Sequence, residues 1–399
     1  MASLLLAIIY LAFISLGLPD SLLGAAWPEM HKDLGVSLAS AGIITMLISV
    51  GTTVSSLFSD RLSKKFSTGI IVTASTALTL LGLLGFSVAP KFWVLCVLAI
   101  PYGLGAGSID AALNNYVALH YTSRDMSWLH CFWGVGTIIS PYVMSYALGT
   151  SHGWSGGYRM VGALQLLILI ILVATLPLWK KVGHKSFATA GDNPDGSVTP
   201  KKSVGLIGSL KIGGVPFVLL GFFGYCGAEA TVMLWSSTYF FGTHSITEEL
   251  AAALGSLFFI GMTVSRFLSG FVANRLGDKM MIRLGLAVSA VGVILTAIPN
   301  HLPITIAGFL LIGLGYGPIY PSIIHSTPSN FGEENSQAII GIQMAAAYLG
   351  STFMPPLFGL VANHISIRLM PLYLALFMAI NLVMIELLWK RSRAHSKEK

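Results

Sequence analysis

The feature that most constrains this chain is a succession of apolar runs, each about 20 residues long. A helix needs about 20 apolar residues to cross the hydrocarbon core of a bilayer. Helices satisfy their own backbone hydrogen bonds in lipid, so runs of this length predict spanning helices. Charged residues make up 10% of the chain, against about 25% in a soluble domain, which is too few to cover a surface that faces water. The sequence therefore predicts an all-α membrane protein with twelve transmembrane helices, at residues 4–26, 36–58, 69–89, 92–118, 128–149, 157–179, 214–241, 250–272, 280–299, 302–325, 336–361 and 368–389.

One connection between these runs is much longer than the others. Residues 180–211 are polar and rich in Gly, Pro, Ser, Asp and Lys, a composition typical of a loop between two halves. The sequence predicts an N-terminal six-helix bundle at 1–179, a cytoplasmic linker at 180–213, and a C-terminal six-helix bundle at 214–399 with a short basic tail. The first apolar run has no basic segment before it and is too long for a signal peptide, so we expect it to be retained as a span.

Lys and Arg residues are distributed unequally between the two ends of the predicted spans. If both termini are cytoplasmic, 19 of the 23 basic residues, Arg266 among them, lie on the inner side. The outer side holds the other four, Lys32, Lys91, Arg159 and Arg368. Inner loops of membrane proteins carry the excess of positive charge. We therefore expect a multi-pass protein of the cell (inner) membrane with both termini in the cytoplasm.

The two halves repeat three short segments in the same order. The segment 103–107 (GLGAG) recurs at 313–317 (GLGYG), 136–141 (GTIISP) recurs at 350–355 (GSTFMP), and 59–62 (SDRL) recurs at 273–276 (ANRL). The distance along the chain from the first copy to the second is nearly the same for all three pairs. A duplication of six helices plus six is the organisation of a transporter whose halves rock around a central site.

The loop after the second predicted span carries a family motif. Residues 58–65 (FSDRLSKK) resemble the motif G-x-x-x-D-R-x-G-R-K of the major facilitator superfamily, with the Asp, the Arg and the basic pair retained. The two glycines of the motif are absent, and Ser63 stands at the second of them. The resemblance implies a fold of two pseudo-symmetric six-helix bundles. It also implies gating contacts at the inner surface, for which the candidates are Asp60, Arg61, Asn274 and Arg275; positive-inside anchoring is the alternative for the basic residues.

Four further segments resemble the fucose:proton symporter group of that superfamily, which also holds glucose/mannose symporters. They are 20–28 (DSLLGAAWP), 110–117 (DAALNNYV), 129–136 (LHCFWGVG) and 227–231 (GAEAT). Asp110 stands where many relatives have Glu, and the run between Asp20 and the following proline is longer than in the group. The resemblance implies that Asp20 and Asp110 serve sugar recognition and proton coupling. It also implies that spans one, four, five, seven, ten and eleven line the cavity.

The carboxyl groups of Asp20, Asp110 and Glu229 lie inside predicted spans. An ionised carboxylate at the bilayer centre costs at least about 2.5–3.5 kcal/mol and needs a partner, a water-filled cavity or a bound proton. None of the three has a Lys or Arg one helical turn away. Burial without a cation favours the protonated form of a carboxyl group, so we expect Asp20 and Asp110 to couple transport to protons. Hydrogen bonding between helices is the alternative for Asp110, and for Glu229 it is as well supported as substrate contact.

Amide and aromatic side chains near these acids are candidate ligands for a polyol. Asn114 lies one helical turn beyond Asp110, and a carboxyl group beside an amide suits hydroxyls that both donate and accept. Trp133 and Tyr320 offer rings for the C–H faces of a sugar, although Trp and Tyr also form interfacial belts. Gln343 lies in a span that the resemblance places at the cavity, but a membrane Gln often only joins helices. The predicted substrate-binding residues are Asp20, Asp110, Asn114, Asn115, Trp133, Glu229, Tyr320 and Gln343.

The sequence carries no signature of an enzyme. It has no Walker A loop, so we expect no drive by ATP, and Cys96, Cys131 and Cys226 lie in apolar segments without metal or redox spacing. The basic residues are scattered over loop ends, which argues against nucleic acid as a partner. We expect a monomer without a metal or cofactor, surrounded by the lipid bilayer and driven by a proton gradient, with sodium as the alternative coupling ion.

The sequence as a whole predicts a secondary active transporter that performs proton-coupled symport of a sugar or related polyol by alternating access. A proton-driven exporter of drugs or amphipathic metabolites is one alternative, which the content of 15 Met residues keeps open. A lipid flippase or a non-transporting receptor on the same fold is another. The substrate itself is not determined, because hydroxyl stereochemistry depends on geometry that residue spacing does not supply.

Overall fold

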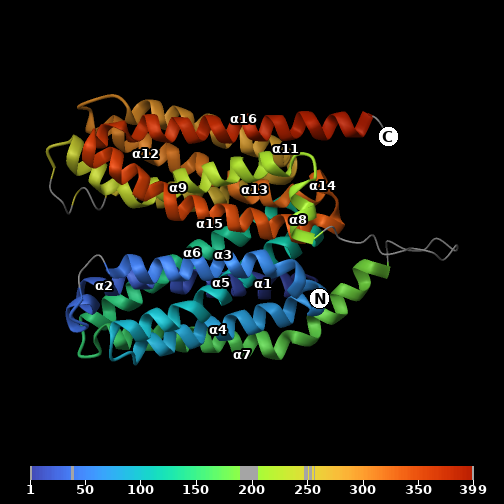
Figure 1. The fold of residues 1–399 in the computed structure, drawn as a ribbon, viewed down its shortest axis with the longest axis horizontal. Coiled ribbons are helices and arrows are strands. Elements are labelled where there is room, and N and C mark those ends of the chain that lie inside the picture. Colours follow the sequence, from blue (N-terminus) through green and yellow to red (C-terminus); the bar gives the residue numbers. More distant parts are fainter. Residues whose placement is uncertain are drawn as a thin grey trace. The chain divides into compact units, whose positions relative to one another are not determined.

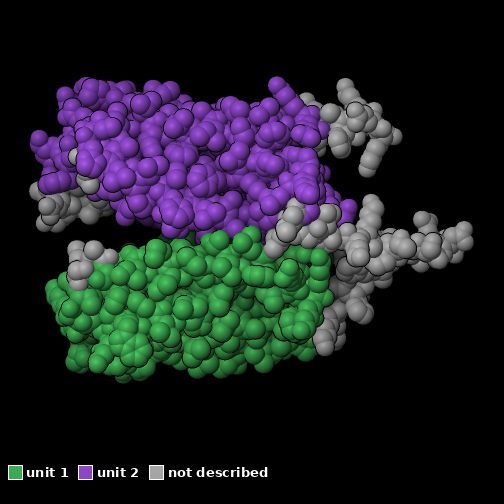
Figure 2. Space-filling view, viewed as in Figure 1, with its two compact units in different colours: residues 1–120, 129–203 green, residues 121–128, 204–399 purple. Residues whose placement is uncertain are grey.

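The computed structural model describes residues 2–36, 40–188, 205–246, 250, 254–255 and 257–397. Regular structure in these residues is helical throughout. The chain divides into two compact units, residues 1–120 with 129–203 and residues 121–128 with 204–399 (Figure 2). Helix α6 therefore begins among residues of the second unit and continues in the first.

The first unit is built from long helices that follow one another along the chain (Figure 1). Helix α4 packs against both α5 and α7, and α3 packs against α5. The helices are α1 (Ala2–Asp20), α2 (Leu22–Asp33), α3 (Ala41–Lys65), α4 (Thr68–Ser87), α5 (Phe92–His120), α6 (Ser123–Leu148) and α7 (Gly153–Ala188).

The second unit repeats this organisation with more interruptions. Helix α9 packs against α15 and α16, and α11 packs against α12. The helices are α8 (Gly205–Leu210), α9 (Val215–Thr243), α11 (Leu257–Thr296), α12 (Leu302–Tyr316), α13 (Ile319–His325), α14 (Thr327–Phe331), α15 (Glu333–His364), the 3₁₀ helix η2 (Ile367–Leu369) and α16 (Met370–Lys397). Of the predicted linker 180–213, residues 189–204 lie outside the described residues, 180–188 continue α7, and 205–210 form α8.

Eleven helices of the described residues are long and apolar enough to cross a membrane. The difference from the twelve predicted spans lies in α11, whose 40 residues cover 257–272 of one predicted span and 280–296 of the next. Gly277 interrupts α11 with φ 72° and ψ 161°. Only glycine reaches that backbone conformation without strain, so the chain bends there and α11 holds two spans.

The predicted duplication is visible in the contacts of the repeated glycines. A Cβ at Gly103 would collide with the carbonyl oxygen of Ile48, and a Cβ at the equivalent Gly313 would collide with that of Phe258. The Ser55 hydroxyl donates to the carbonyl of Leu104, and the equivalent Ser265 hydroxyl donates to that of Leu314. Each contact residue of the second unit follows its counterpart in the first unit by the same number of positions as Gly313 follows Gly103. These glycines therefore permit the same close helix contact in both units, α3 against α5 and α11 against α12.

Candidate functional site

The first part of the candidate site lies where helix α1 ends. Pro19 stands in the last turn of α1, the helix ends at Asp20, and α2 begins at Leu22. The exposed carboxylate of Asp20 accepts a hydrogen bond of 2.8 Å from the indole Nε1–H of Trp133 on α6. Among the described residues, no Lys or Arg forms an ion pair with Asp20. The partner that holds this carboxylate is therefore a neutral donor.

Glycines place Trp133 opposite Asp20. A Cβ at Gly17 on α1 would collide with the carbonyl oxygen of Trp133, and a Cβ at Gly136 on α6 would collide with that of Ile14. Small residues at both positions let the two helix backbones approach each other closely. Gly17 stands three residues, about one helical turn, before Asp20 on α1, so this contact places Trp133 beside the carboxylate.

The second part of the site is a chain of three buried polar side chains on α5 and α6. The Asn114 amide donates from Nδ2 to Oδ1 of Asp110 at 2.7 Å, and Asn114 Oδ1 lies 3.0 Å from Nε2 of His130. Asp110, Asn114 and His130 are 7%, 0% and 5% exposed. An amide oxygen only accepts hydrogen bonds, so His130 donates and carries a proton on Nε2. The amide thereby connects an acid to an imidazole inside the first unit.

The two carboxylates of the first unit belong to one group. Asp20 and Asp110 lie close enough to repel each other electrostatically, and the hydroxyl of Tyr102 lies within reach of the Asp20 charge. Asn115 follows on α5 and is also buried. The structure therefore brings together Asp20, Asp110, Asn114 and Trp133 of the predicted residues, and adds His130 and Tyr102 to them.

The second unit holds its carboxylate differently. Glu229, in the middle of α9, accepts from the guanidinium of Arg266 on α11 at 3.3 Å and from the hydroxyl of Tyr225 at 3.2 Å. The Arg266 side chain is 4% exposed and that of Glu229 is 14% exposed. Tyr225 also donates to the carbonyl of Tyr316 at 2.9 Å and stacks on its ring. Arg266 is thus a buried partner of Glu229, which corrects its assignment to the inner side of the membrane.

The remaining predicted ligands of the second unit lie in different surroundings. The ring of Tyr320 packs beside Phe222 with centroids 4.7 Å apart, and its hydroxyl lies 3.1 Å from the Met344 sulfur. Gln343 is fully buried, and its Oε1 accepts from the Thr327 hydroxyl at 3.0 Å. Tyr320 therefore belongs to the aromatic cluster next to Glu229, whereas Gln343 ties α15 to α14.

Comparison with known proteins decides the family. The model of the Major Facilitator Superfamily matches residues 9–254 and 217–399. The chain belongs to the major facilitator superfamily. It is therefore a multi-pass membrane transporter of a small molecule and not an enzyme, as the sequence predicted.

Relatives within the superfamily cover nearly the whole chain. The uncharacterized transporter y4wD of Sinorhizobium fredii is 25% identical over 88% of this chain and 90% of its own length. The glucose/mannose transporter GlcP of Bacillus subtilis is 20% identical over 90% and 88%. The quinolone resistance protein NorA of Staphylococcus aureus is 23% identical over 98% and 96%. The crystal structure of a variant of the E. coli fucose:proton symporter FucP superposes with a TM-score of 0.76 at 17% identity, covering 96% of this chain and 98% of that one, which confirms the predicted fold.

The residues of the superfamily's loop motif make local contacts. Asp60 pairs with Lys64 one turn along α3 at 2.6 Å, and the Arg61 guanidinium lies over the Phe58 ring, 5.4 Å from its centroid. In the repeat of the motif, Asn274 Oδ1 accepts from the backbone N–H of Arg124 at 3.1 Å, and Arg275 is exposed. The gating role predicted for Asp60, Arg61, Asn274 and Arg275 stays a prediction.

Sequence reasoning missed Arg266, although the repeat contained a signal for it. Ile14 in α1 and Phe223 in α9 make the equivalent carbonyl contacts with Gly136 and Gly350. Asp20 and Glu229 each follow six residues after these positions, so they are counterparts in the two halves. Because Ser265 is the counterpart of Ser55, Arg266 falls on the next position, the buried Ser56 of α3, well inside a span rather than at its end. That position in the repeat could have excluded a loop location for Arg266.

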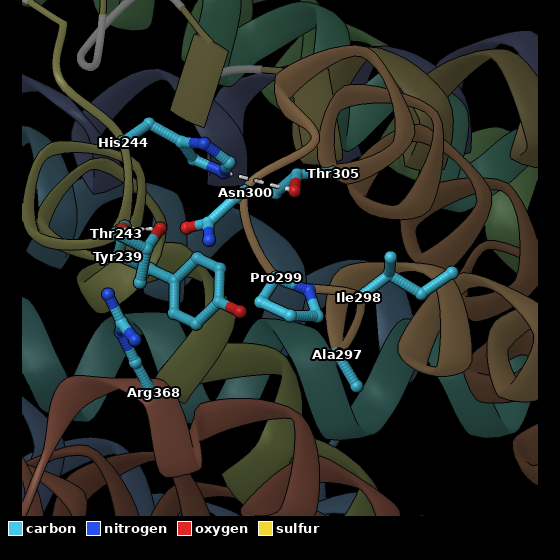
Figure 3. Close-up of a pocket in the computed structure, with 9 residues that line it drawn as sticks. All are labelled: Tyr239, Thr243, His244, Ala297, Ile298, Pro299, Asn300, Thr305 and Arg368. Atoms are coloured by element: carbon cyan, nitrogen blue, oxygen red, sulfur yellow. Dashed lines mark hydrogen bonds between the residues drawn. The ribbon is translucent and has the colours of Figure 1, made fainter.

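A small cavity of about 50 Å³ lies at the ends of α9 and α11 in the second unit (Figure 3). Its lining includes the buried residues Tyr239 and Thr305 and the exposed Arg368. The Nε2 atom of His244 lies 3.1 Å from the Thr305 hydroxyl. Pockets for small molecules usually measure about 300–1,000 Å³, so this cavity does not hold the transported substrate.

Proposed function

We propose that this member of the superfamily couples the uptake of a sugar or related polyol to protons by alternating access. Asp20 and Asp110 are the proton-carrying groups. The second unit supplies Glu229 and Tyr320 as further substrate contacts. The protein lies in the cell (inner) membrane with both termini in the cytoplasm.

The observation that carries this proposal is the pair of carboxylates in the first unit. The partners described for them, the Trp133 indole and the Asn114 amide, are neutral. Two like charges within electrostatic reach of each other disfavour the doubly ionised state, so such a pair is suited to hold one proton. A carboxylate within a span needs a partner, water or a proton, and a proton taken from an aqueous opening satisfies that need reversibly.

The polar groups around the pair support a polyol as the substrate. A hydroxyl donates one hydrogen bond and accepts two, and the group combines carboxylate oxygens with indole, amide and imidazole N–H donors that bond to one another in this structure. The Trp133 ring supplies an apolar face beside Asp20. Two proteins that the chain resembles are named for sugars, the glucose/mannose transporter GlcP and the fucose:proton symporter FucP.

The proposed cycle follows from this chemistry. In the outward-open form one proton binds the Asp20–Asp110 pair and leaves it with a single negative charge, which removes the repulsion between the two groups and lets hydroxyls of the substrate approach. Substrate binding then favours closure, and opening to the inside exposes the pair to a less acidic solution. The proton leaves, the repulsion returns, and the substrate is released.

Transport by the purified protein in liposomes tests the proposal. A thermal-shift screen at two pH values, against sugars, polyols, nucleosides and amphipathic drugs, first selects a ligand, because a ligand that binds the native state raises its melting temperature. The selected sugar is then added outside liposomes that contain a pH-sensitive dye. Symport predicts acidification of the lumen that depends on the sugar, and an unchanged dye signal during sugar uptake contradicts proton coupling.

The likeness to NorA favours a second candidate, proton-driven export of amphipathic compounds. The same carboxylates would serve that cycle with the proton moving against the substrate. Loss of a fluorescent amphipathic dye from liposomes under a proton gradient, without sugar-dependent acidification, supports the exporter. Replacing the proton gradient by a sodium gradient in the same liposomes tests the alternative coupling ion.

A further inference from the structure

A cluster of basic side chains lies on the surface of the second unit where α11 and α16 pack together. Figure 1 shows these two helices in the C-terminal part of the chain. Lys279 and Arg283 stand one turn apart on α11, and Glu386 and Lys390 stand one turn apart on α16. Trp389 lies between them, and we call these five residues the α11–α16 basic cluster. Its three cations and one carboxylate give it a net charge of +2.

The contacts within the cluster fix one cation and leave two others at the surface. Arg283 donates to both carboxylate oxygens of Glu386, at 2.7 and 2.8 Å, in a bidentate ion pair. The buried ring of Trp389 lies under two cations, 5.5 Å from Lys279 Nζ and 5.2 Å from Arg283 Cζ. Lys279 and Lys390 are exposed, and neither has a carboxylate partner among the residues that the structure describes. Two ammonium groups are therefore available to an anion.

The position of the cluster indicates which anion it meets. Lys279 stands two residues after the bend at Gly277, where the second span of α11 begins, and Lys390 follows the apolar part of α16. The apolar side chains beside the cluster are themselves exposed: Met280, Leu284, Val383 and Leu387. In a membrane protein an exposed apolar face next to the end of a span contacts acyl chains, so the cations stand at the depth of the lipid phosphates.

We propose that the α11–α16 basic cluster binds the head group of an anionic phospholipid. Lys279 and Lys390 contact the phosphate, and the acyl chains lie along the exposed apolar residues of α11 and α16. The Trp389 ring and the Arg283–Glu386 pair hold the two helices in register under the head group. Basic pockets between helices at the membrane surface bind anionic lipids by this combination of charge and apolar contact.

Native mass spectrometry of the purified full chain with added phosphatidylglycerol or phosphatidylcholine tests the proposal. The wild type is expected to retain phosphatidylglycerol in preference to phosphatidylcholine. The double variant Lys279→Gln/Lys390→Gln is expected to bind phosphatidylglycerol roughly thirtyfold more weakly, if each lysine contributes its usual share. Circular dichroism checks that the variant is folded, which is expected because both side chains are exposed.

A matched control separates this site from general attraction between a basic protein and an anionic lipid. The variant Lys91→Gln/Arg159→Gln removes the same two charges from exposed positions of the first unit and is expected to retain phosphatidylglycerol like the wild type. Equal losses in both double variants, or no preference for phosphatidylglycerol over phosphatidylcholine, would overturn the proposal. Glycerol phosphate binding as tightly as the whole lipid would also overturn it, because the apolar face would then contribute nothing.

Discussion

Asp20 and Glu229 occupy equivalent positions in the two halves of the molecule, but the donor that holds Asp20 is neutral and one that holds Glu229 is charged. Each lies six residues beyond the carbonyl that meets a glycine of the partner helix, Gly136 in one unit and Gly350 in the other. Asp20 accepts from an indole, whereas Glu229 accepts from the buried guanidinium of Arg266 and from Tyr225. A duplicated fold has kept the carboxylate and changed its partner.

The difference shows how the same fold can give two roles to a carboxylate at equivalent positions. An arginine beside a buried carboxylate favours the charged form of that carboxylate. A carboxylate held by neutral donors gains and loses a proton at much lower cost. We therefore expect proton coupling in the first unit, and a fixed charge that orients the binding surface in the second.

The largest effect is expected from Asp110→Asn, which removes one titrating group of the first unit. The variant should lose proton-driven accumulation of the substrate and keep exchange of substrate across the membrane, because exchange needs no net proton movement. Uptake into liposomes with and without a pH gradient measures both. Asp33→Asn is the control, since Asp33 is a carboxylate of the same unit that accepts from a neutral donor, the indole of Trp154, at 2.7 Å but lies exposed at the end of α2. Accumulation by Asp110→Asn at the rate of the wild type would refute the proposed coupling.

The variant Arg266→Ser tests the contrast between the partners of Asp20 and Glu229. It places in the second unit the residue that stands at the equivalent position of the first unit, Ser56. Glu229 then loses its cation in a buried site, and we expect a loss of stability of about 3 kcal/mol. The double variant Arg266→Ser/Glu229→Gln removes both charges and should regain most of that loss. Thermal unfolding of the purified variants measures the difference. If the single and double variants melt alike, the ion pair does not stabilise the second unit.

A smaller effect is expected when the amide between acid and imidazole is removed. Asn114→Leu leaves Asp110 and His130 without the group that joins them, so we expect the KM for substrate to rise roughly tenfold, the equivalent of one to two hydrogen bonds. Asn381→Leu is the matched control, because Asn381 is a buried amide of the second unit that donates to the carbonyl of Gly221 at 2.8 Å. That variant should lose stability and keep its KM. Equal KM values for the two variants would contradict a substrate role for Asn114.

The smallest effect is expected at His244. Here an arginine of the second unit, Arg368, lies near a histidine and shifts its pKa, whereas Arg266 pairs with a carboxylate. Burial and the nearby charge of Arg368 lower the pKa of His244 below its usual value of 6.5. The unfolded chain therefore takes up a proton more readily than the folded one, and stability is lost as the pH falls below about 6.5. His244→Gln should remove part of this loss, a difference of roughly 1 °C in Tm between pH 7.5 and 5.5. Parallel pH profiles of the variant and the wild type would contradict the assignment.

The sequence by itself determined the elements of this protein. The length of the apolar runs predicted the spanning helices. The repeated glycines predicted a duplication, and the helix contacts of the two units repeat at the same interval as these glycines. The position of Asp20 behind Pro19 and the spacing of Asp110 and Asn114 predicted an acidic group in the first unit. These features depend on local composition and helical periodicity, which a single chain displays directly.

Only the tertiary structure decided which partners meet. His130 joins Asn114 across 16 positions of sequence, Trp133 reaches Asp20 across 113, and Arg266 reaches Glu229 across 37. These contacts arise from the angle and rotation at which helices pack, which depend on many side chains of both helices at once. Spacing within one helix fixes its own faces and leaves open which face of another helix it meets.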